Sequence, residues 1–179
     1  MPYEPVPDLA SLSLAQIAEL NDARKLPPVE QWNPAHSGDS WMVIKADGRW
    51  FHDGGEIRRP AMIRAFAGLL RRDEQGQHWL VTPHEKQSIE VEDAAFIATD
   101  VSPAEGALAF RLNTDEIVLA GPDNPLTAHG DAETPALYLA VRHGTEARIN
   151  RSTWLQLVEL AGDDLTVSSL GARFSLVPQ

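Results

Sequence analysis

Basic residues gather around one short segment of the sequence, in an arrangement suited to binding an anion. Arg58 and Arg59 stand directly before Pro60, and Arg64 follows it, in a segment whose apolar spacing predicts a helix that begins at Pro60. The positive end of a helix dipole attracts anions, and guanidinium groups bind carboxylate or phosphate oxygens in pairs. The sequence therefore predicts an anion-binding site, for which the candidate ligand-binding residues are Trp50, His52, Arg58, Arg59, Arg64, Lys86 and Asp93.

The same charges allow a simpler interpretation, in which the arginines form ion pairs with Glu90, Glu92 and Asp93. Glu90 and Glu92 share one face of a predicted strand, because side chains alternate along a strand. Paired carboxylates of this kind suit acid–base chemistry. They are also typical of the solvent-facing side of a strand, so the sequence leaves both interpretations open.

Motifs for catalysis, metal binding and phosphate binding are absent from the sequence. The chain has no cysteine, which excludes disulfides, thiolate nucleophiles and zinc ribbons. Its six histidines have none of the spacings typical of metal sites, and neither GxSxG nor a glycine-rich phosphate loop occurs. We therefore predict no catalytic residues, no metal and no cofactor. The enzyme alternative is an unrecognised activity on an anionic metabolite, with His52 and Asp93 as acid–base groups.

The charge of the chain restricts its partners. The net charge is −11, which disfavours binding to nucleic acid, although residues 41–80 carry seven Lys/Arg and five Asp/Glu and are therefore net positive. No apolar run is long enough to cross a membrane, and the start "MPYEPVPDLA" lacks the features of a signal peptide. We expect a cytoplasmic protein, a monomer or weak homodimer, that binds an anionic small molecule and neither nucleic acid nor membrane.

The elements of the first half must position these residues. Residues 13–24 predict a helix with a capping box between Ser13 and Gln16, and three prolines in residues 26–34 predict an extended connector. Asp47-Gly48 predicts a two-residue hairpin turn within residues 41–53, which would pair Ile44 with Phe51 and place Trp50 on the solvent-leaning face. The next helix is expected over 60–72, with its apolar face formed by Met62, Ile63, Phe66, Leu69 and Leu70.

The second half alternates strands with turn-forming residues. Strands are expected over 89–92 and 95–101, followed by hairpins that turn at residues 113–115 and at His143-Gly144. Residues 122–135 predict a surface loop, because they hold three prolines and many turn formers. A helix is expected over 151–164, with an apolar face of Trp154, Leu155, Val158 and Ala161, before one or two closing strands.

One pattern occurs twice: "GQHWLVTP" (76–83) and "GARFSLVP" (171–178) each follow a predicted hairpin and helix. We therefore predict an α+β fold with two tandem ββαβ-like structural repeats, 41–83 and 136–178, joined by a strand-rich middle segment and preceded by an N-terminal helix. The domain boundaries would be 1–34, 35–106 and 107–179. Phe66 and Trp154 are the expected buried anchors of the two helices. Arg58 and Arg64 correspond to Asn150 and Gln156, so only the first repeat is basic.

Several segments carry a resemblance to a known family. They are "LPPVEQWNP" (26–34), "DGRWF" (47–51), "WLVTP" followed by "EK" (79–86), "IEVEDAAF" (89–96), "AGP" (120–122) and "EARINRSTWLQLVELA" (146–161). With them the chain resembles an uncharacterised bacterial family, domain-of-unknown-function family 1285. The resemblance implies a two-repeat α+β architecture and a suggested role in signal transduction, and it supplies no catalytic residues.

Together these observations predict a non-catalytic module that binds a small anionic molecule or regulates another protein, in the context of bacterial signal transduction. The first alternative is the small enzyme described above. The second is a protein–protein adaptor without a small-molecule pocket, which would show a flat exposed apolar patch.

Overall fold

The computed structural model describes residues 8–179, which divide into two compact units. One unit consists of Lys25–Ile97 and Ala140–Arg148; the other consists of the N-terminal segment ending at Arg24, Ala98–Leu139 and Ile149–Gln179. No helix in the described part of the chain is both long and apolar enough to span a membrane. The candidate site lies in the first of these units, so its sheet is described first.

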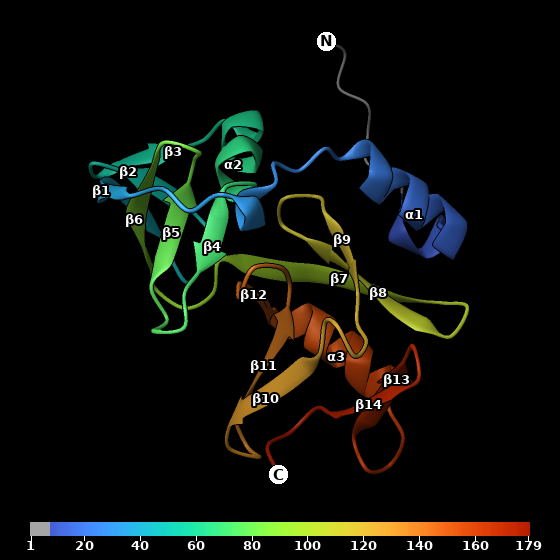
Figure 1. Cartoon of the computed structure of the whole chain (residues 1–179). Coiled ribbons are helices and arrows are strands. Elements are labelled where there is room, and N and C mark those ends of the chain that lie inside the picture. The colour runs from blue at the N-terminus through green and yellow to red at the C-terminus, as the bar shows by residue number, and fades with distance from the viewer. Residues whose placement is uncertain (1–7) are drawn as a thin grey trace. The chain divides into compact units, whose positions relative to one another are not determined.

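The first sheet has six strands, in the spatial order β3-β2-β1-β6-β5-β4 (Figure 1). They are β1 (His36–Ile44), β2 (Trp50–His52), β3 (Gly55–Ile57), β4 (Leu70–Arg72), β5 (His78–Val81) and β6 (Glu85–Val91). Two antiparallel meanders, β1-β2-β3 and β4-β5-β6, meet where β1 pairs with β6 in parallel. The chain crosses from one meander to the other through α2 (Pro60–Ala67).

The second sheet repeats this strand order, as β10-β11-β12-β7-β8-β9. Its strands are β7 (Phe96–Ala104), β8 (Ala107–Leu112), β9 (Ile117–Leu119), β10 (Leu126–Gly130), β11 (Pro135–Ala140) and β12 (Glu146–Ile149). After it come α3 (Arg151–Leu160) and a two-stranded sheet of β13 (Thr166–Ser169) and β14 (Ala172–Ser175). The predicted α+β class with two similar halves and an N-terminal helix is therefore confirmed.

The repeating unit is larger than the sequence pattern indicates. Segments 41–83 and 136–178 both contain a hairpin, a helix and a second hairpin in that order. However, β4 and β5 belong to the first six-stranded sheet, whereas β13 and β14 pair only with each other in their own sheet. The two segments therefore do not share a strand order, and what recurs in the structure is the six-stranded sheet.

The N-terminal helix α1 (Leu14–Ala23) forms as predicted, with 3-10 turns at Leu9–Ser11 and Val29–Gln31 on either side. Ser13 Oγ accepts a hydrogen bond from Gln16 N, and Gln16 Oε1 accepts one from Ser13 N, which is the expected capping box. Ile17 is the buried residue of α1 and clusters with Leu9, Ala109 and Ile117. This packing attaches the helix to β8 and β9.

The predicted helix over 60–72 is too long. α2 ends at Ala67, and Leu70–Arg72 form β4, where Leu70 pairs with Leu80 of β5. As the edge strand of the sheet, these three residues pair with β5 on one side and bury Leu70, which outweighs their helix propensity. A similar correction applies to 122–135, where Leu126–Gly130 form β10, paired with β11 at the edge of the second sheet.

The apolar faces of both later helices are rotated from the predicted positions. Met62 is 40% exposed and Leu155 is 49% exposed, whereas the fully buried residues are Ala67 on α2 and Thr153 and Leu157 on α3. Phe66 and Trp154, the expected anchors, are only half-buried. Small and polar residues can occupy the closest approach of a helix to a sheet, and a pattern read from large apolar residues alone misses them.

The hairpin between β1 and β2 has a different register from the predicted one. Lys45 N donates to Arg49 O and Gly48 N donates to Lys45 O, so the loop contains three residues, with Gly48 at φ +88°. This is a type I turn closed by a glycine bulge. The extra residue pairs Ile44 with Trp50 instead of Phe51 and turns the Trp50 side chain into the protein.

Stability should fall with acidification because of His78 on β5. Burial, and then the nearby Arg72 charge, lower the pKa of His78 to about 4 from its ordinary 6.5. As the pH falls, the unfolded chain therefore protonates His78 before the folded protein does. The stability that neutral His78 gives the folded protein is complete above pH 6.5 and is lost as the pH falls towards 4. We expect a loss of up to about 3 kcal/mol in the free energy of unfolding over this range.

Urea unfolding at pH 7.5, 5.5 and 4.5 measures this effect. His78→Gln cannot titrate, so its free energy of unfolding should depend less on pH than that of the wild-type protein. Identical pH dependence in the two proteins would contradict the assignment to His78.

Candidate ligand-binding site

An irregularity in the central pair of the first sheet creates the candidate site. The pairing of β1 with β6 runs from Asp39 opposite Ser88 to Val43 opposite Glu90, so β1 carries two extra residues there. Ser40 holds the bulge: its Oγ donates to Ser88 O over 2.7 Å and accepts from Met42 N over 3.1 Å. A bulge re-aims the side chains beside it, and here it directs Trp41 out of the sheet.

Trp41 is both strained and exposed. It has φ +58°, a conformation that is rare for a bulky residue, and it is 68% exposed. Its backbone N donates to Asp39 Oδ1 over 2.8 Å, and its carbonyl accepts from Asp53 N over 2.9 Å. Hydrogen bonds on both sides therefore hold the backbone of Trp41 in a conformation that leaves its indole exposed.

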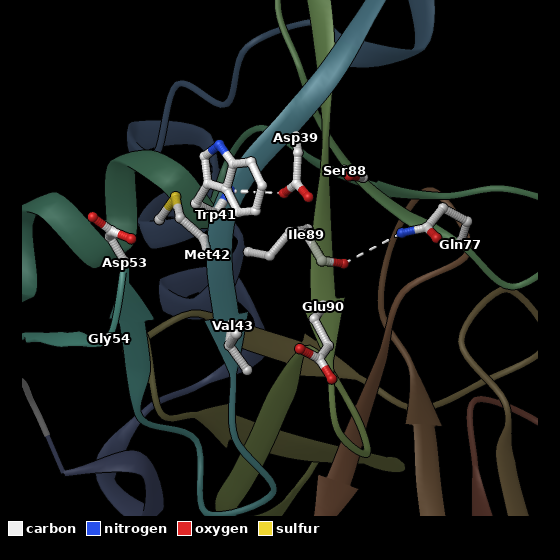
Figure 2. A pocket seen from close by; sticks show the side chains of 10 residues that line it. All are labelled: Asp39, Trp41, Met42, Val43, Asp53, Gly54, Gln77, Ser88, Ile89 and Glu90. Atoms are coloured by element: carbon white, nitrogen blue, oxygen red, sulfur yellow. Dashed lines mark hydrogen bonds between the residues drawn. The ribbon is translucent and has the colours of Figure 1, made fainter.

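Beside Trp41 lies a pocket with a volume of about 500 Å³, open to solvent (Figure 2). Buried Met42 and Ile89 and half-buried Val43 supply its apolar surface. The full lining is Asp39, Trp41, Met42, Val43, Asp53, Gly54, Gln77, Ser88, Ile89 and Glu90. The β2–β3 turn contributes Asp53 and Gly54, which have φ +50° and +83°, as a tight two-residue hairpin requires.

The lining carries negative charge that other groups do not neutralise. In the part of the chain that the structure describes, none of the carboxylates of Asp39, Asp53 and Glu90 has an ion pair. The Gln77 amide adds an acceptor: its Nε2 donates to His78 O over 2.8 Å and to Ile89 O over 3.4 Å. Both partners are acceptors, so the amide oxygen is left to accept a bond.

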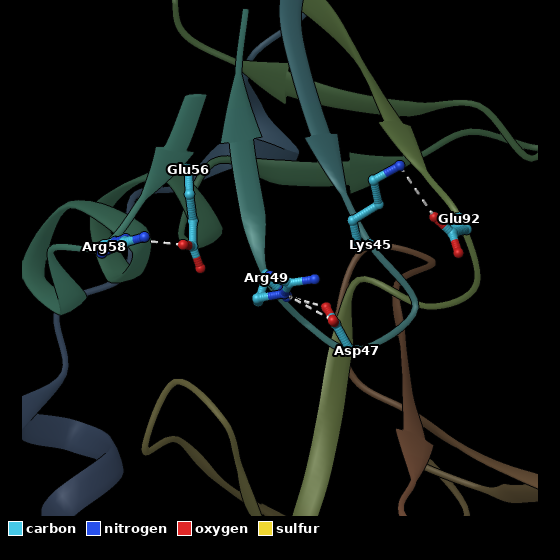
Figure 3. Close-up of polar contacts among 6 residues, drawn as sticks. All are labelled: Lys45, Asp47, Arg49, Glu56, Arg58 and Glu92. Atoms are coloured by element: carbon cyan, nitrogen blue, oxygen red, sulfur yellow. Dashed lines mark hydrogen bonds and ion pairs between the residues drawn. The ribbon is translucent and has the colours of Figure 1, made fainter. Parts of the chain in front are cut away.

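Several other carboxylates of this unit have cationic partners. Lys45 pairs with Glu92 at 3.5 Å, Arg49 with Asp47 at 2.7 Å and Arg58 with Glu56 at 2.9 Å (Figure 3). The expected pairing of the arginines with Glu90, Glu92 and Asp93 is therefore wrong for Arg58, and Glu92 takes Lys45 instead. Asp73, Glu74 and Glu85 of the same unit also have no ion pair among the described residues, but they lie outside the pocket lining. The pocket differs from its surroundings because three unpaired carboxylates line one cavity without a lysine or arginine.

The predicted position of Trp50 on a solvent-leaning face is wrong. Trp50 is 1% exposed and its ring stacks on Phe66, with a centroid distance of 6.4 Å. The cause is the three-residue turn described above, which shifts the register by one and exchanges the two faces of β2. Trp50 therefore supports the sheet from its core.

The arginines lie around α2, but the helix start offers an anion few donors. Arg59 occupies the N-cap position without a side-chain cap, and Arg58 and Arg64 are exposed. Pro60 has no N–H, and the N–H groups of Met62 and Ile63 both donate to Arg59 O. Of the first helical N–H groups, only that of Ala61 is left to meet a ligand.

The other predicted site residues are separated in the sheet. His52 is exposed and pairs with Met42 on one side of β1, whereas Asp93 follows β6 on the other side and pairs with Arg148 at 3.2 Å. The Lys86 ammonium lies 4.2 Å from the ring centroid of Trp79. Residues 8–179 contain no group of three or more His, Cys, Asp or Glu side chains that could hold a metal ion.

Sequence reasoning missed the pocket because its key residue depends on a bulge. Trp41 opens a strand-like run, and nothing in its neighbours marks two extra residues in a parallel pairing. The Asp53-Gly54 pair was the available signal, because Asp-Gly is typical of a two-residue hairpin turn. It would have placed Asp53 beside the end of β1.

Comparisons with known proteins agree with this architecture. Residues 27–94 match the model described as domain of unknown function (DUF1285), N-terminal domain, and residues 95–176 match that of protein of unknown function (DUF1285), C-terminal domain. Comparison with curated proteins finds no match.

Two crystal structures are similar to the chain. A DUF1285 family protein from Silicibacter pomeroyi DSS-3 is 39% identical, with a TM-score of 0.78 over 86% of this chain and 88% of that one. One from Shewanella baltica OS155 is 20% identical, with a TM-score of 0.56 over 67% of this chain and 91% of that one, and shows a similar fold. From both domain matches and the first of these structures, the chain belongs to the DUF1285 family.

Proposed function

We propose that this protein is a non-catalytic module that binds a small molecule in the pocket beside Trp41. The observation that carries the proposal is the pocket itself, in which an exposed aromatic ring and unpaired polar groups surround an apolar surface. Its volume of about 500 Å³ lies within the range typical of small-molecule sites. Binding without turnover suits a regulatory role in bacterial signal transduction.

The catalytic alternative has less support from the arrangement of the site. The two residues expected to act as acid and base, His52 and Asp93, lie on opposite sides of β1, and Asp93 is held by Arg148. General acid–base catalysis needs both groups within hydrogen-bond reach of one substrate. The positions of His52 and Asp93 therefore favour ligand binding over catalytic turnover.

An anion bound at α2 is a second candidate, favoured by Arg58 and Arg59 at a helix start that has no side-chain cap. Arg58 already pairs with Glu56, and a ligand there would compete with that carboxylate. Inorganic phosphate is the simplest probe. A phosphate-induced stabilisation that is lost in Arg59→Ala would support this candidate over the pocket.

A thermal-shift screen against cationic, anionic and neutral metabolites tests the main proposal. A pocket ligand at ten times its dissociation constant should raise the melting temperature by roughly 3–6 °C. The shift should be lost in Trp41→Ala and kept in Leu155→Ala, which removes another exposed apolar side chain in the other unit. Shifts of equal size in both variants would contradict binding at the pocket.

A further inference from the structure

Resting on the proposed function, we propose that the pocket beside Trp41 binds an organic cation, an ammonium group carried on a small apolar body. The indole of Trp41 and the carboxylates of Asp39, Asp53 and Glu90 would hold the charge, and Met42 and Ile89 would contact the apolar part. This ligand class differs from the anion that the sequence predicts.

Charge is the first argument. The pocket lining holds three carboxylates and no lysine or arginine. Five other carboxylates of the same unit pair with Lys or Arg: Asp47, Glu56, Glu92, Asp93 and Glu146. Asp73, Glu74 and Glu85 also have no ion pair among the described residues, but they do not line the pocket. In the pocket, three unpaired carboxylates surround one cavity. A cation entering the pocket would supply the missing partner, whereas an anion would be repelled.

The indole is the second argument, and it is independent of the carboxylates. A tryptophan ring face attracts cations because of its quadrupole. In the same unit the ring of Trp79 is already covered by the Lys86 ammonium at 4.2 Å, whereas no cation of residues 8–179 lies over Trp41. Hydrogen bonds at both the N–H and the carbonyl of Trp41 fix its backbone, so less freedom is lost on binding.

The apolar surface of the pocket and the Gln77 amide further restrict the chemical class of the ligand. The buried side chains of Met42 and Ile89 line the pocket, and a hydrated inorganic ion would gain no hydrophobic stabilisation from contact with them. The volume of about 500 Å³ also exceeds what a single ion needs. A carbon-bearing ammonium compound satisfies the apolar and charged surfaces at once, and the Gln77 oxygen can accept from a hydroxyl or N–H on it.

Choline and 3,3-dimethylbutan-1-ol form a matched pair of probes, because they have nearly the same shape and differ in charge. Each is titrated into the ¹⁵N-labelled full chain while the indole N–H signal of Trp41, assigned with Trp41→Leu, is followed. We expect choline to shift this signal with at least tenfold higher affinity than the alcohol. Raising the salt concentration should weaken choline binding and leave the alcohol unchanged.

Two neighbouring glutamates give the matched variants. Glu90→Gln removes a pocket carboxylate and should weaken choline binding at least threefold, as should Asp53→Asn, in which asparagine tolerates the positive φ of the turn. Glu92→Gln removes a carboxylate two residues along the chain that pairs with Lys45, outside the pocket lining, and should leave affinity unchanged. Far-UV circular dichroism confirms that each variant is folded.

Equal affinity for choline and the alcohol would overturn the inference, as would equal losses in Glu90→Gln and Glu92→Gln. Failure of the cation class differs from failure of the proposed function. If a neutral or anionic compound stabilises the wild-type protein and not Trp41→Ala, the pocket binds a ligand and only the cation class is wrong. If no compound does so, both are wrong.

Discussion

Replacing Trp50 with alanine is expected to lower the free energy of unfolding by about 3–5 kcal/mol. Trp50 is 1% exposed and lies between Ile44 and Ile57 on neighbouring strands, with its ring stacked on Phe66 of α2. Alanine would leave a cavity between the sheet and the helix that packed backbone cannot fill. Chemical denaturation with urea measures the change.

A second tryptophan of the same unit is the control. Trp41 is 68% exposed, and alanine would adopt the same positive φ with similar strain, so Trp41→Ala should change stability by no more than about 0.5 kcal/mol. Trp50→Phe should recover much of the loss, because the buried Trp50 Nε1 has no hydrogen-bond partner among residues 8–179. A cost below about 1 kcal/mol for Trp50→Ala would place its side chain outside the core.

Gly144→Ala is the second substitution expected to have a large effect, with a loss of roughly 2–5 kcal/mol. Gly144 has φ +79° in the hairpin turn between β11 and β12, so alanine is strained there in any surroundings. In addition, a Cβ at this position would lie 2.7 Å from the backbone oxygen of Arg72. The neighbouring Arg72 N donates to His143 O, so that backbone cannot move away without breaking this bond.

Gly106→Ala separates the cost of the positive φ from the cost of the steric contact with Arg72. Gly106 has φ +87° in another turn, and a Cβ there would have no atom within 4 Å, so only the conformational cost of about 1–2 kcal/mol applies. Thermal unfolding of both variants should show a clearly larger loss for Gly144→Ala. Equal losses would mean that the contact with Arg72 adds nothing to the cost.

Local turn chemistry was the most predictable part of the fold. His143-Gly144 adopts the two positive φ values that its sequence predicts, at +51° and +79°, and Ser13 forms its capping box. At Asp47-Gly48 the same reasoning located the turn but chose a two-residue loop over a three-residue one. Both loops accept Asp-Gly, and the choice between them is made by the packing of Trp50 in the core, which a local sequence window does not contain.

The candidate site was largely outside the reach of sequence reasoning. Glu90 was singled out for its place on β6, but Trp41, Asp39 and Gln77 come together only through the bulge and through pairing of strands that are distant in sequence. The sequence favours the arginine-rich segment as a binding site because its charges are close together along the chain. The sequence shows which charges are neighbours along the chain. The charge of a pocket depends instead on which side chains remain unpaired after the sheet has formed.

The strand order of the first sheet also has a consequence for the rate of folding. Each meander pairs neighbouring strands and can form early, because only short loops must close. The parallel pair β1–β6 joins His36 to Glu85 and the residues after each, so it requires closure of a loop of nearly fifty residues. Pairing of such distant segments slows folding. The bulge that carries Trp41 lies in this pair, so its indole reaches its final position only when the two meanders have joined.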